Sequence, residues 1–268
     1  MAGAGPSFLT LPERPAKPRA AGLTHVLDKG YSLDRVASVL AAYSGWIDVW
    51  KLGWGTAYVE PALAEKVRLL RDHQIKPCTG GTLLEIAWLQ GRVDEFVEFA
   101  TWAGFECVEV SRGSTDMLLA EKNRIIRQAR SLGFEVFAEV GSKNPGDLVS
   151  ASEWVAELEA DLDAGADWLV AEGRESGTVG LYDAGGHLRE DLLDELESAA
   201  AARSIIYEAP QRAQQAHLLR RLGPEVNLGN IALDDVMGLE TLRRGLRSDT
   251  IGLGIAGVLG PCALRGRL

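Results

Sequence analysis

Four stretches of the chain share one pattern, and they read CVEVSRGS (107–114), VFAEVGSK (136–143), LVAEGRES (169–176) and IIYEAPQR (205–212). Each is an apolar run that ends in a glutamate, followed by a small residue and a polar or cationic turn. The glutamates recur at spacings of 30, 33 and 36 residues, at Glu109, Glu139, Glu172 and Glu208. Because a carboxylate at the end of a buried strand is costly without a partner, these equivalent positions predict one shared site.

The sequence around this pattern alternates between strand-like and helix-like segments. Short apolar runs predict eight strands, at Thr24–Leu27, Ile47–Leu52, Ile75–Cys78, Cys107–Val110, Glu135–Val140, Trp168–Ala171, Ile205–Glu208 and Val226–Leu228. Amphipathic stretches predict helices between and after them, at Ser32–Tyr43, Pro61–Asp72, Val93–Ala103, Ser114–Leu132, Ala151–Ala164, Leu188–Ala202, Gln214–Leu222 and Asp234–Leu246. Alternating βα units form parallel sheets, and no Gly-rich dinucleotide motif follows the first strand. We therefore predict an α/β fold of the (β/α)₈ TIM-barrel type rather than a doubly wound sheet.

The length of 268 residues suits a single domain of this kind, because such barrels typically take about 250 residues. We predict a flexible N-terminal arm over residues 1–16, a catalytic barrel over 17–250 and a C-terminal tail over 251–268. The tail is apolar but rich in glycine and interrupted by Pro261, and the first residues lack the pattern of a signal peptide. The sequence thus predicts no membrane association and a cytoplasmic location.

Composition narrows the classes of function. The formal net charge of −10 and the isoelectric point near 5.0 argue against a nucleic-acid-binding surface. Cys78, Cys107 and Cys262 are far apart and have neither zinc-binding nor disulfide-framework spacing. The four histidines also lack metal-ligand spacing, and His25, the one on a predicted strand, is expected to be a core residue.

The repeated glutamates are expected at the mouth of the barrel. Side chains alternate along a strand between the interior and the helix layer, and function gathers at the C-terminal ends of the strands. Phe137 and Glu139 share one side of their strand, as do Ile206 and Glu208. Facing outward, these glutamates would lie beneath apolar helices, so we predict that they face inward. The alternative is a set of interior salt bridges that only close the barrel.

Cations and glycine-rich turns accompany the glutamates. Lysines and arginines lie at or just beyond the predicted strand ends, at Lys29, Lys51, Arg112, Lys143, Arg174 and Arg212. Glutamates supply oxygen ligands for Mg²⁺, so the mixed ring favours an anionic substrate held through this ion. Turns such as CTGGT, SRGST and NLGNI offer backbone N–H groups to an anion, and the last of them favours Gly229 and Asn230 as phosphate ligands. Trp54 is expected near the pocket.

Long motifs of this chain resemble the phosphosulfolactate synthase family. They read KPRAAGLTHVLDKGYS, WKLGWGTAYVE, CTGGTLLEIAWLQG, VEVSRGST, FAEVGSK, AEGRESGTVGLYD and EAPQRAQQ, followed by VNLGNI and LRSDT. The resemblance runs in order from about Lys17 to Thr250. It implies a (β/α)₈ barrel enzyme that adds sulfite to phosphoenolpyruvate with Mg²⁺, giving (2R)-phospho-3-sulfolactate on the way to coenzyme M. Plant heat-stress-associated proteins are similar to the family as well.

The resemblance also implies roles for single residues. The family's EVGKK-type turn matches Glu139 to Lys143, with Ser142 in place of the first lysine. Lys143 is then expected to protonate C2 of a metal-stabilised enolate, with Lys51 in reserve. The metal ligands are expected to be Glu139, Glu172 and Glu208. In an alternative arrangement two of them bind the metal ion, and the third holds a lysine. The phosphate or sulfite is expected to contact a set of basic and hydroxyl side chains, namely Lys29, Ser111, Arg112 and Arg174.

Two alternatives stay open beside this function. The departure at Ser142 leaves room for the same enolate chemistry with another nucleophile or another phosphorylated enol acid. A non-catalytic stress or interaction protein of the same family is the third possibility, although a binding scaffold does not need a ring of buried charges. In each case we expect a homo-oligomer.

Overall fold

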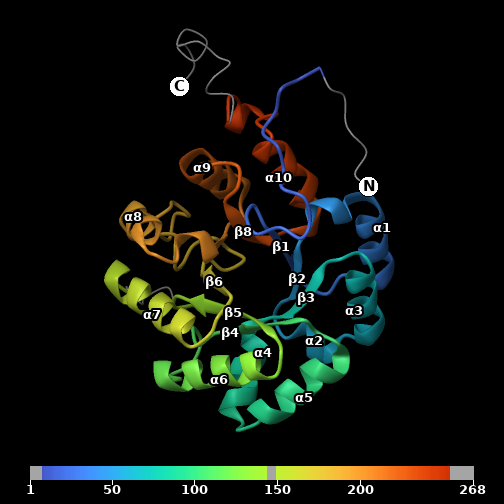
Figure 1. The fold of residues 1–268 in the computed structure, drawn as a ribbon, viewed down its shortest axis with the longest axis vertical. Coiled ribbons are helices and arrows are strands. Elements are labelled where there is room, and N and C mark those ends of the chain that lie inside the picture. Colours follow the sequence, from blue (N-terminus) through green and yellow to red (C-terminus); the bar gives the residue numbers. More distant parts are fainter. Residues whose placement is uncertain (1–7, 144–148, 254–268) are drawn as a thin grey trace.

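The computed structural model describes residues 8–143 and 149–253 and shows eight parallel strands closed into a barrel (Figure 1). Each strand pairs with its neighbour in the sequence, and the last pairs with the first. Their bounds are β1 Thr24–Asp28, β2 Val49–Leu52, β3 Lys76–Thr79, β4 Cys107–Val110, β5 Glu135–Val140, β6 Trp168–Ala171, β7 Ile205–Glu208 and β8 Asn227–Ile231. The predicted TIM barrel is therefore confirmed.

Helices alternate with the strands and surround the barrel (Figure 1). Their bounds are α1 Leu33–Tyr43, α2 Thr56–Val59, α3 Leu63–Asp72, α4 Gly81–Leu89, α5 Val93–Ala103, α6 Leu119–Ser131, α7 Ala151–Asp163, α8 Glu190–Ser198, α9 Arg212–Leu222 and α10 Val236–Arg243. Each strand is short and buried on both faces, as is usual for parallel sheets. The helices present an apolar stripe to the strands, which α3 does with Leu63, Val67 and Leu70.

The predicted elements differ from the observed ones mainly where glycines or turns intervene. The predictions for β4 to β7 match in full, and those for the other strands shift by one to three residues at an end. Helix α4 was expected to be a glycine-rich turn. It begins at Gly81 instead, because the apolar run that follows is long enough for two helical turns. Helix α6 begins at Leu119, five residues later than predicted.

Two apolar layers hold the barrel together. The larger lies between the strands and the helices and includes Val26, Trp50 and Leu169. The smaller fills the barrel interior with Leu23, just before β1, and with the inward residues of six strands, Val49, Cys78, Cys107, Phe137, Val170 and Ile206. After five of these residues, the next inward position along the chain, two residues later, carries a charged side chain: Lys51, Glu109, Glu139, Glu172 and Glu208. The apolar interior thus ends where a charged layer begins.

The two ends of the chain lie only partly within the described structure. Residues 8–16 of the predicted arm contact the barrel, since Arg14 forms an ion pair with Glu240 of α10 at 2.9 Å. Most of the predicted tail, residues 254–268, lies outside the described residues, and the proposed domain bounds stay a prediction. In the part of the chain that the structure describes, no helix has the length and apolar character needed to cross a membrane.

A buried lysine fixes the strand that carries Glu139. Lys122 of α6 is fully buried, and its Nζ donates to the backbone oxygen of Glu139 at 2.7 Å. The same Nζ lies 2.6 Å from Asp161 and 2.8 Å from Glu157, both on α7. One ammonium group therefore connects two helices to the end of β5.

Replacing this lysine should cost much more stability than replacing an exposed cation of the same helix. Lys122→Met leaves the fully buried Asp161 without its ion-pair partner, which typically costs about 3–5 kcal/mol. Arg124→Met removes an ion pair whose arginine is half exposed, and such pairs contribute about 0–1 kcal/mol. Urea unfolding at neutral pH measures both changes. Equal losses in the two variants would contradict this account of α6.

Candidate active site

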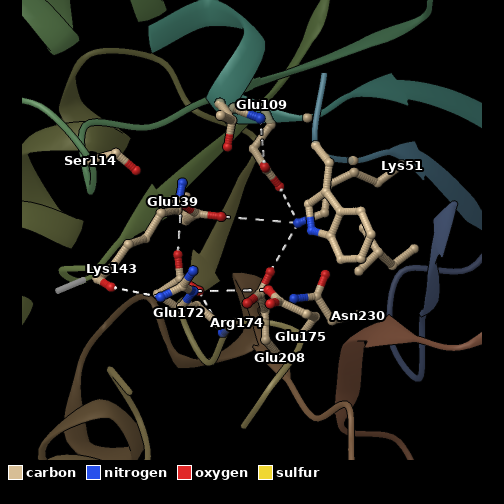
Figure 2. A pocket seen from close by; sticks show the side chains of 16 residues that line it. Lys51, Glu109, Ser114, Glu139, Lys143, Glu172, Arg174, Glu175, Glu208 and Asn230 are labelled. Carbon is tan, nitrogen blue, oxygen red and sulfur yellow. Dashed lines mark hydrogen bonds and ion pairs between the residues drawn. The ribbon is translucent and has the colours of Figure 1, made fainter. Parts of the chain in front are cut away.

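Four glutamates meet inside the C-terminal end of the barrel (Figure 2). Glu109, Glu139 and Glu208 lie on β4, β5 and β7, and Glu172 follows β6 directly. Each is at most 4% exposed, and all four line one cavity of about 350 Å³. Since side chains alternate along a strand, the inward position of the apolar residue two places earlier forces each glutamate into this cavity. The inward orientation expected from the sequence is therefore correct.

Lys51, the inward residue of β2, joins two of these glutamates. Its Nζ lies 2.9 Å from a carboxylate oxygen of both Glu109 and Glu208, and 4.0 Å from Glu139 (Figure 2). Burial lowers the pKa of Lys51, but the three carboxylates outweigh burial and hold this pKa well above its usual value. These carboxylates thus favour the ammonium form of Lys51 within the ring.

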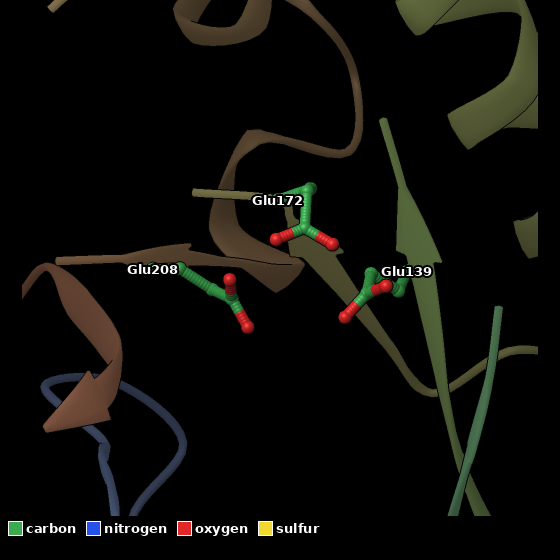
Figure 3. Close-up of side chains that lie close together, drawn as sticks. All are labelled: Glu139, Glu172 and Glu208. Carbon is green, nitrogen blue, oxygen red and sulfur yellow. The ribbon is translucent and has the colours of Figure 1, made fainter. Parts of the chain in front are cut away.

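Three of the four carboxylates form a group that could hold a metal ion. Glu139, Glu172 and Glu208 each offer one oxygen, and these three oxygens lie within 4.8 Å of one another (Figure 3). Backbone N–H groups orient the trio: Gly173 donates to Glu208 at 2.9 Å and Arg174 to Glu172 at 2.5 Å. The second oxygen of Glu172 is buried and lacks a hydrogen-bond donor among the described residues. A buried carboxylate oxygen without a donor suits a cation.

The charges around Glu172 and Glu139 shift the pKa values of these two groups in opposite directions. Burial and the charges of Glu139 and Glu208 raise the pKa of Glu172 well above its usual value. Burial acts on Glu139 in the same direction, but Lys143 and Lys51 reverse it and lower the pKa of Glu139 to about 2. The pKa values of these two neighbouring carboxyl groups therefore shift in opposite directions, because only Glu139 is close to both lysines.

Lys143 extends the ring from the turn after β5. Its Nζ lies 2.8 Å from Glu139, 3.1 Å from Glu85 and 3.9 Å from Glu172. Burial lowers the pKa of Lys143, but these carboxylates, Glu139 first, hold it above its usual value. With a side chain 16% exposed and lining the cavity, Lys143 is more accessible than Lys51.

Glu85 belongs to this charged layer, although the sequence analysis did not select it. It lies on α4, is 1% exposed, and accepts a hydrogen bond from Ser111 and one from the backbone of Ser114 at 2.8 Å. It does not follow a strand, so the repeated pattern could not reveal it. The signal was a glutamate inside the apolar run TLLEIAWL. Five carboxylates therefore surround two ammonium groups.

A glycine at the start of α4 allows this close packing. A Cβ at Gly81 would lie 2.2 Å from the Ser111 oxygen and 3.3 Å from Glu109. The Gly81 N–H instead donates to Glu109 at 2.9 Å. Ser111 itself is fully buried and bonded to Glu85, so the structure places it beneath the cavity rather than in its wall.

Several other predicted site residues lie at the mouth of the cavity. Trp54, Arg174 and Asn230 line it, and all three have left-handed backbone conformations, with φ of 53° to 54°. Such residues are uncommon outside functional sites. The Asn230 side-chain oxygen is buried without a donor within the described chain. Lys29 does not line the cavity but stacks on the Trp54 ring, with 5.0 Å between its Nζ and the ring centre.

Two predicted arginines are not brought to this cavity. Arg112 turns toward α7 and pairs with Glu157 at 2.5 Å, which supports the Lys122 network. Arg212 is largely exposed at the start of α9, 3.8 Å from Asp249. Gly229 precedes Asn230 in β8, where a Cβ would lie 3.1 Å from Ile206 and 3.2 Å from the His25 ring. Sequence position alone could not separate these orientations, because a residue beyond a strand can turn toward either layer.

A comparison with known protein families matches residues 12–249 to the model described as (2R)-phospho-3-sulfolactate synthase (ComA). The chain belongs to this family. It is 42% identical over 250 residues to the phosphosulfolactate synthase of Methanothermobacter thermautotrophicus, covering 91% of this chain and 96% of that protein. The identity is 44% with the Methanocaldococcus jannaschii protein of the same name, and the matched region covers 86% of this chain and 94% of that protein. For the Bacillus subtilis protein the identity is 39%, with 90% and 97% covered.

This membership confirms the resemblance inferred from the motifs and makes the chain an enzyme of that family. Solved structures agree on the fold. The 3-keto-L-gulonate-6-phosphate decarboxylase of Vibrio cholerae superposes with a TM-score of 0.54 at 15% identity, covering 83% of this chain and 97% of that one. The 3-hexulose-6-phosphate synthase of Salmonella typhimurium gives 0.52 at 15% identity, with 82% and 97% covered. At such identities the likeness concerns the barrel alone.

A divalent cation should bind to the trio and stabilise the fold. Because it relieves repulsion among buried carboxylates, a cation at a hundred times its dissociation constant should add about 2.7 kcal/mol to the free energy of unfolding. Glu172→Gln should weaken cation binding at least about tenfold while leaving the metal-free protein as stable as the original, since it also removes a repelling charge.

Calorimetric titration and thermal unfolding with and without chelator measure the two effects. Glu135→Gln is the matched control, since Glu135 lies at the start of β5 and pairs with Lys76. Unchanged cation affinity in Glu172→Gln would remove Glu172 from the metal site.

Proposed function

We propose that this enzyme adds sulfite to phosphoenolpyruvate with the help of Mg²⁺, giving (2R)-phospho-3-sulfolactate. The observation that carries the proposal is the placement of a buried carboxylate trio and Lys143 around one small cavity. The names of the curated relatives support the reaction. The cavity volume of about 350 Å³ is at the small end for ligand sites, in keeping with substrates of this size.

Glu139, Glu172 and Glu208 would hold the Mg²⁺ ion. Their oxygen atoms are ligands of the type this ion prefers, and the Glu172 oxygen that accepts no hydrogen bond in the described structure fits a ligand role. When bound, the ion supplies positive charge for the negative charge that develops on the substrate carboxylate. Lys51 pairs with Glu208 and Glu109 at 2.9 Å from each, and its positive charge offsets part of the repulsion among the buried carboxylates.

The rim residues are suited to the phosphate and sulfite groups. Arg174 lines the cavity, and its guanidinium donates to the backbone oxygen of Lys143 at 3.1 Å, which orients it across the mouth. Asn230 lines the same cavity from β8, two strands away from the strand that precedes Arg174. Lys29 lies one layer further out on Trp54. We assign these residues to substrate binding. Arg112 and Ser111 were expected to share this role, but Arg112 pairs with Glu157 and Ser111 donates a hydrogen bond to Glu85.

The chemical step needs one new carbon–sulfur bond and one proton. Sulfur of sulfite attacks the methylene carbon of phosphoenolpyruvate, the double-bond electrons move toward the carboxylate, and C2 then takes a proton. We assign the proton to the Nζ of Lys143. The ammonium form is secured by Glu139 and Glu172, and neutralising these carboxylates lowers the pKa of Lys143 toward the range useful for a general acid. Lys51 remains the reserve donor, since it also lines the cavity.

The position of Ser142 supports Lys143 over its neighbour as the donor. Ser142 replaces the lysine expected from the family turn, and it lines a separate cavity together with Arg112 and Glu157. Lys143 lines the glutamate cavity. The same departure favours the second candidate, in which another nucleophile attacks phosphoenolpyruvate or a similar phospho-enol acid.

Substituting Lys143 should abolish most of the activity. We expect Lys143→Ala to lower kcat by about 10²- to 10⁴-fold, the usual contribution of a general acid. The assay combines protein, phosphoenolpyruvate, sulfite and Mg²⁺ and detects the sulfonate product by mass spectrometry. Lys76→Ala, a change of the same type at the other end of the barrel, is the matched control and should keep full activity.

Two outcomes distinguish the candidate reactions, and a third tests the assignment of the proton donor. A sulfonate product that disappears with chelator supports sulfite addition. Binding of phosphoenolpyruvate that needs the metal, without a sulfonate product, supports the second candidate. A fully active Lys143→Ala enzyme would show that the proton comes from elsewhere, with Lys51 as the next residue to test.

We also propose that the enzyme is a homo-oligomer. Large apolar side chains are more than half exposed on and beside α2, α4 and α5, namely Trp54, Tyr58, Val59, Leu89 and Trp102. Trp54, Tyr58 and Val59 border a cavity of about 600 Å³ that adjoins the active-site mouth through Trp54. Contiguous apolar surface of this kind typically marks an interface. A cytoplasmic location stays a prediction.

Sedimentation velocity tests the oligomer. The enzyme should sediment as a multimer, and Tyr58→Ser with Val59→Ser should shift it toward the monomer because the apolar area buried between subunits is reduced. Leu246→Ser, at an exposed leucine that follows α10, is the control. A monomeric original enzyme would refute the proposal.

A further inference from the structure

A second charged cavity lies at the opposite end of the barrel. Its lining comes from segments that precede strands: residues 14–19 before β1, residues 44–46 before β2, and His73 and Gln74 before β3. The active site lies beyond the other ends of the same strands. This cavity measures about 660 Å³, which is within the usual range for small-molecule sites.

The cavity is strongly basic in a chain whose net charge is −10. Four cations line it, and the lining contains no carboxylate: Arg14, Lys17, Arg19 and Arg244. Two carboxylates lie behind this wall. Asp48 pairs with Arg19 at 2.8 Å, and Glu240 is shared between Arg14 at 2.9 Å and Arg244 at 3.2 Å. The cations therefore outnumber their partners two to one.

Lys17 and Arg14 are the two cations that lack adequate partners. The Nζ of Lys17 donates only to the backbone oxygens of Ser44 and Ile47, at 3.1 Å and 2.6 Å. Burial lowers its pKa to about 8, because Asp48 does not compensate fully. Arg14 is 4% exposed, and of its three nitrogens only Nε has an acceptor, on Glu240.

The two terminal nitrogens of Arg14 are buried without any acceptor in the described structure. Buried N–H groups nearly always have a partner, and leaving a charged donor without one is costly. Arginine presents its N–H groups in a planar fork that matches oxyanions. A buried guanidinium with two unused donors, in a wall of cations, is arranged for a negatively charged ligand.

We propose that this cavity is a second anion-binding site, which takes a tetrahedral oxyanion of the phosphate or sulfonate class. Arg14 and Arg244 are its principal ligands, and Lys17 and Arg19 supply further positive charge. The bound anion joins the N-terminal segment to α10, which run side by side in Figure 1. The site is separate from the proposed reaction and does not depend on it.

The test exploits the difference between the two ends of the barrel. With chelator present, five carboxylates repel anions from the active site, so inorganic phosphate titrated at constant ionic strength should bind only here. Calorimetry should then give one phosphate per chain. Arg14→Gln and Arg244→Gln should each weaken the affinity at least about tenfold, and Arg174→Gln at the active-site rim should not change it.

Two measurements keep the result interpretable. Circular dichroism checks that Arg14→Gln is folded, and Arg244→Gln, whose side chain is partly exposed, provides the second variant. Titration with methanesulfonate in place of phosphate shows whether the site prefers sulfonates or phosphates, because the preferred anion binds more tightly. Absence of binding by the original enzyme, an affinity in both arginine variants that equals that of the original enzyme, or loss of binding in Arg174→Gln would overturn the proposal.

Discussion

The enclosure of five carboxylates with two ammonium groups at one end of the barrel governs the rest of this structure. Burial of such an excess of negative charge is unfavourable, and the raised pKa of Glu172 expresses that cost. Lys51 and Lys143 relieve part of it through distances of 2.8 to 3.1 Å to their partners. The remaining negative charge makes the trio of Glu139, Glu172 and Glu208 a group that could hold a cation, and such an ion would connect the stability of the fold to its chemistry.

The scaffold around this charged layer limits how far it can relax. The apolar interior closes it from below, Lys122 fixes the end of β5 from outside, and the missing side chain of Gly81 lets Glu109 and Ser111 approach α4. The left-handed residues at the rim add local strain. Rigid support of this kind is what an electrostatic mechanism requires, because the charges must stay in place while the substrate changes.

Much of this arrangement could be predicted from the sequence, because strand periodicity fixes orientation. An apolar residue two places before a glutamate, as Phe137 is to Glu139, places both inward, so the barrel and its glutamate ring followed from the pattern. Glu85 was missed because it comes from a helix that was expected to be a turn. Arg112 was placed at the substrate, yet it turns outward to Glu157. Side chains beyond the strands depend on tertiary contacts, which no local pattern encodes.

Anomalous diffraction from crystals soaked in Mn²⁺, a scattering substitute for Mg²⁺, tests the central claim most directly. The account predicts a single strong anomalous peak between Glu139, Glu172 and Glu208, within coordination distance of at least two of them. A well-ordered site without that peak, or a peak only elsewhere in the molecule, would contradict it.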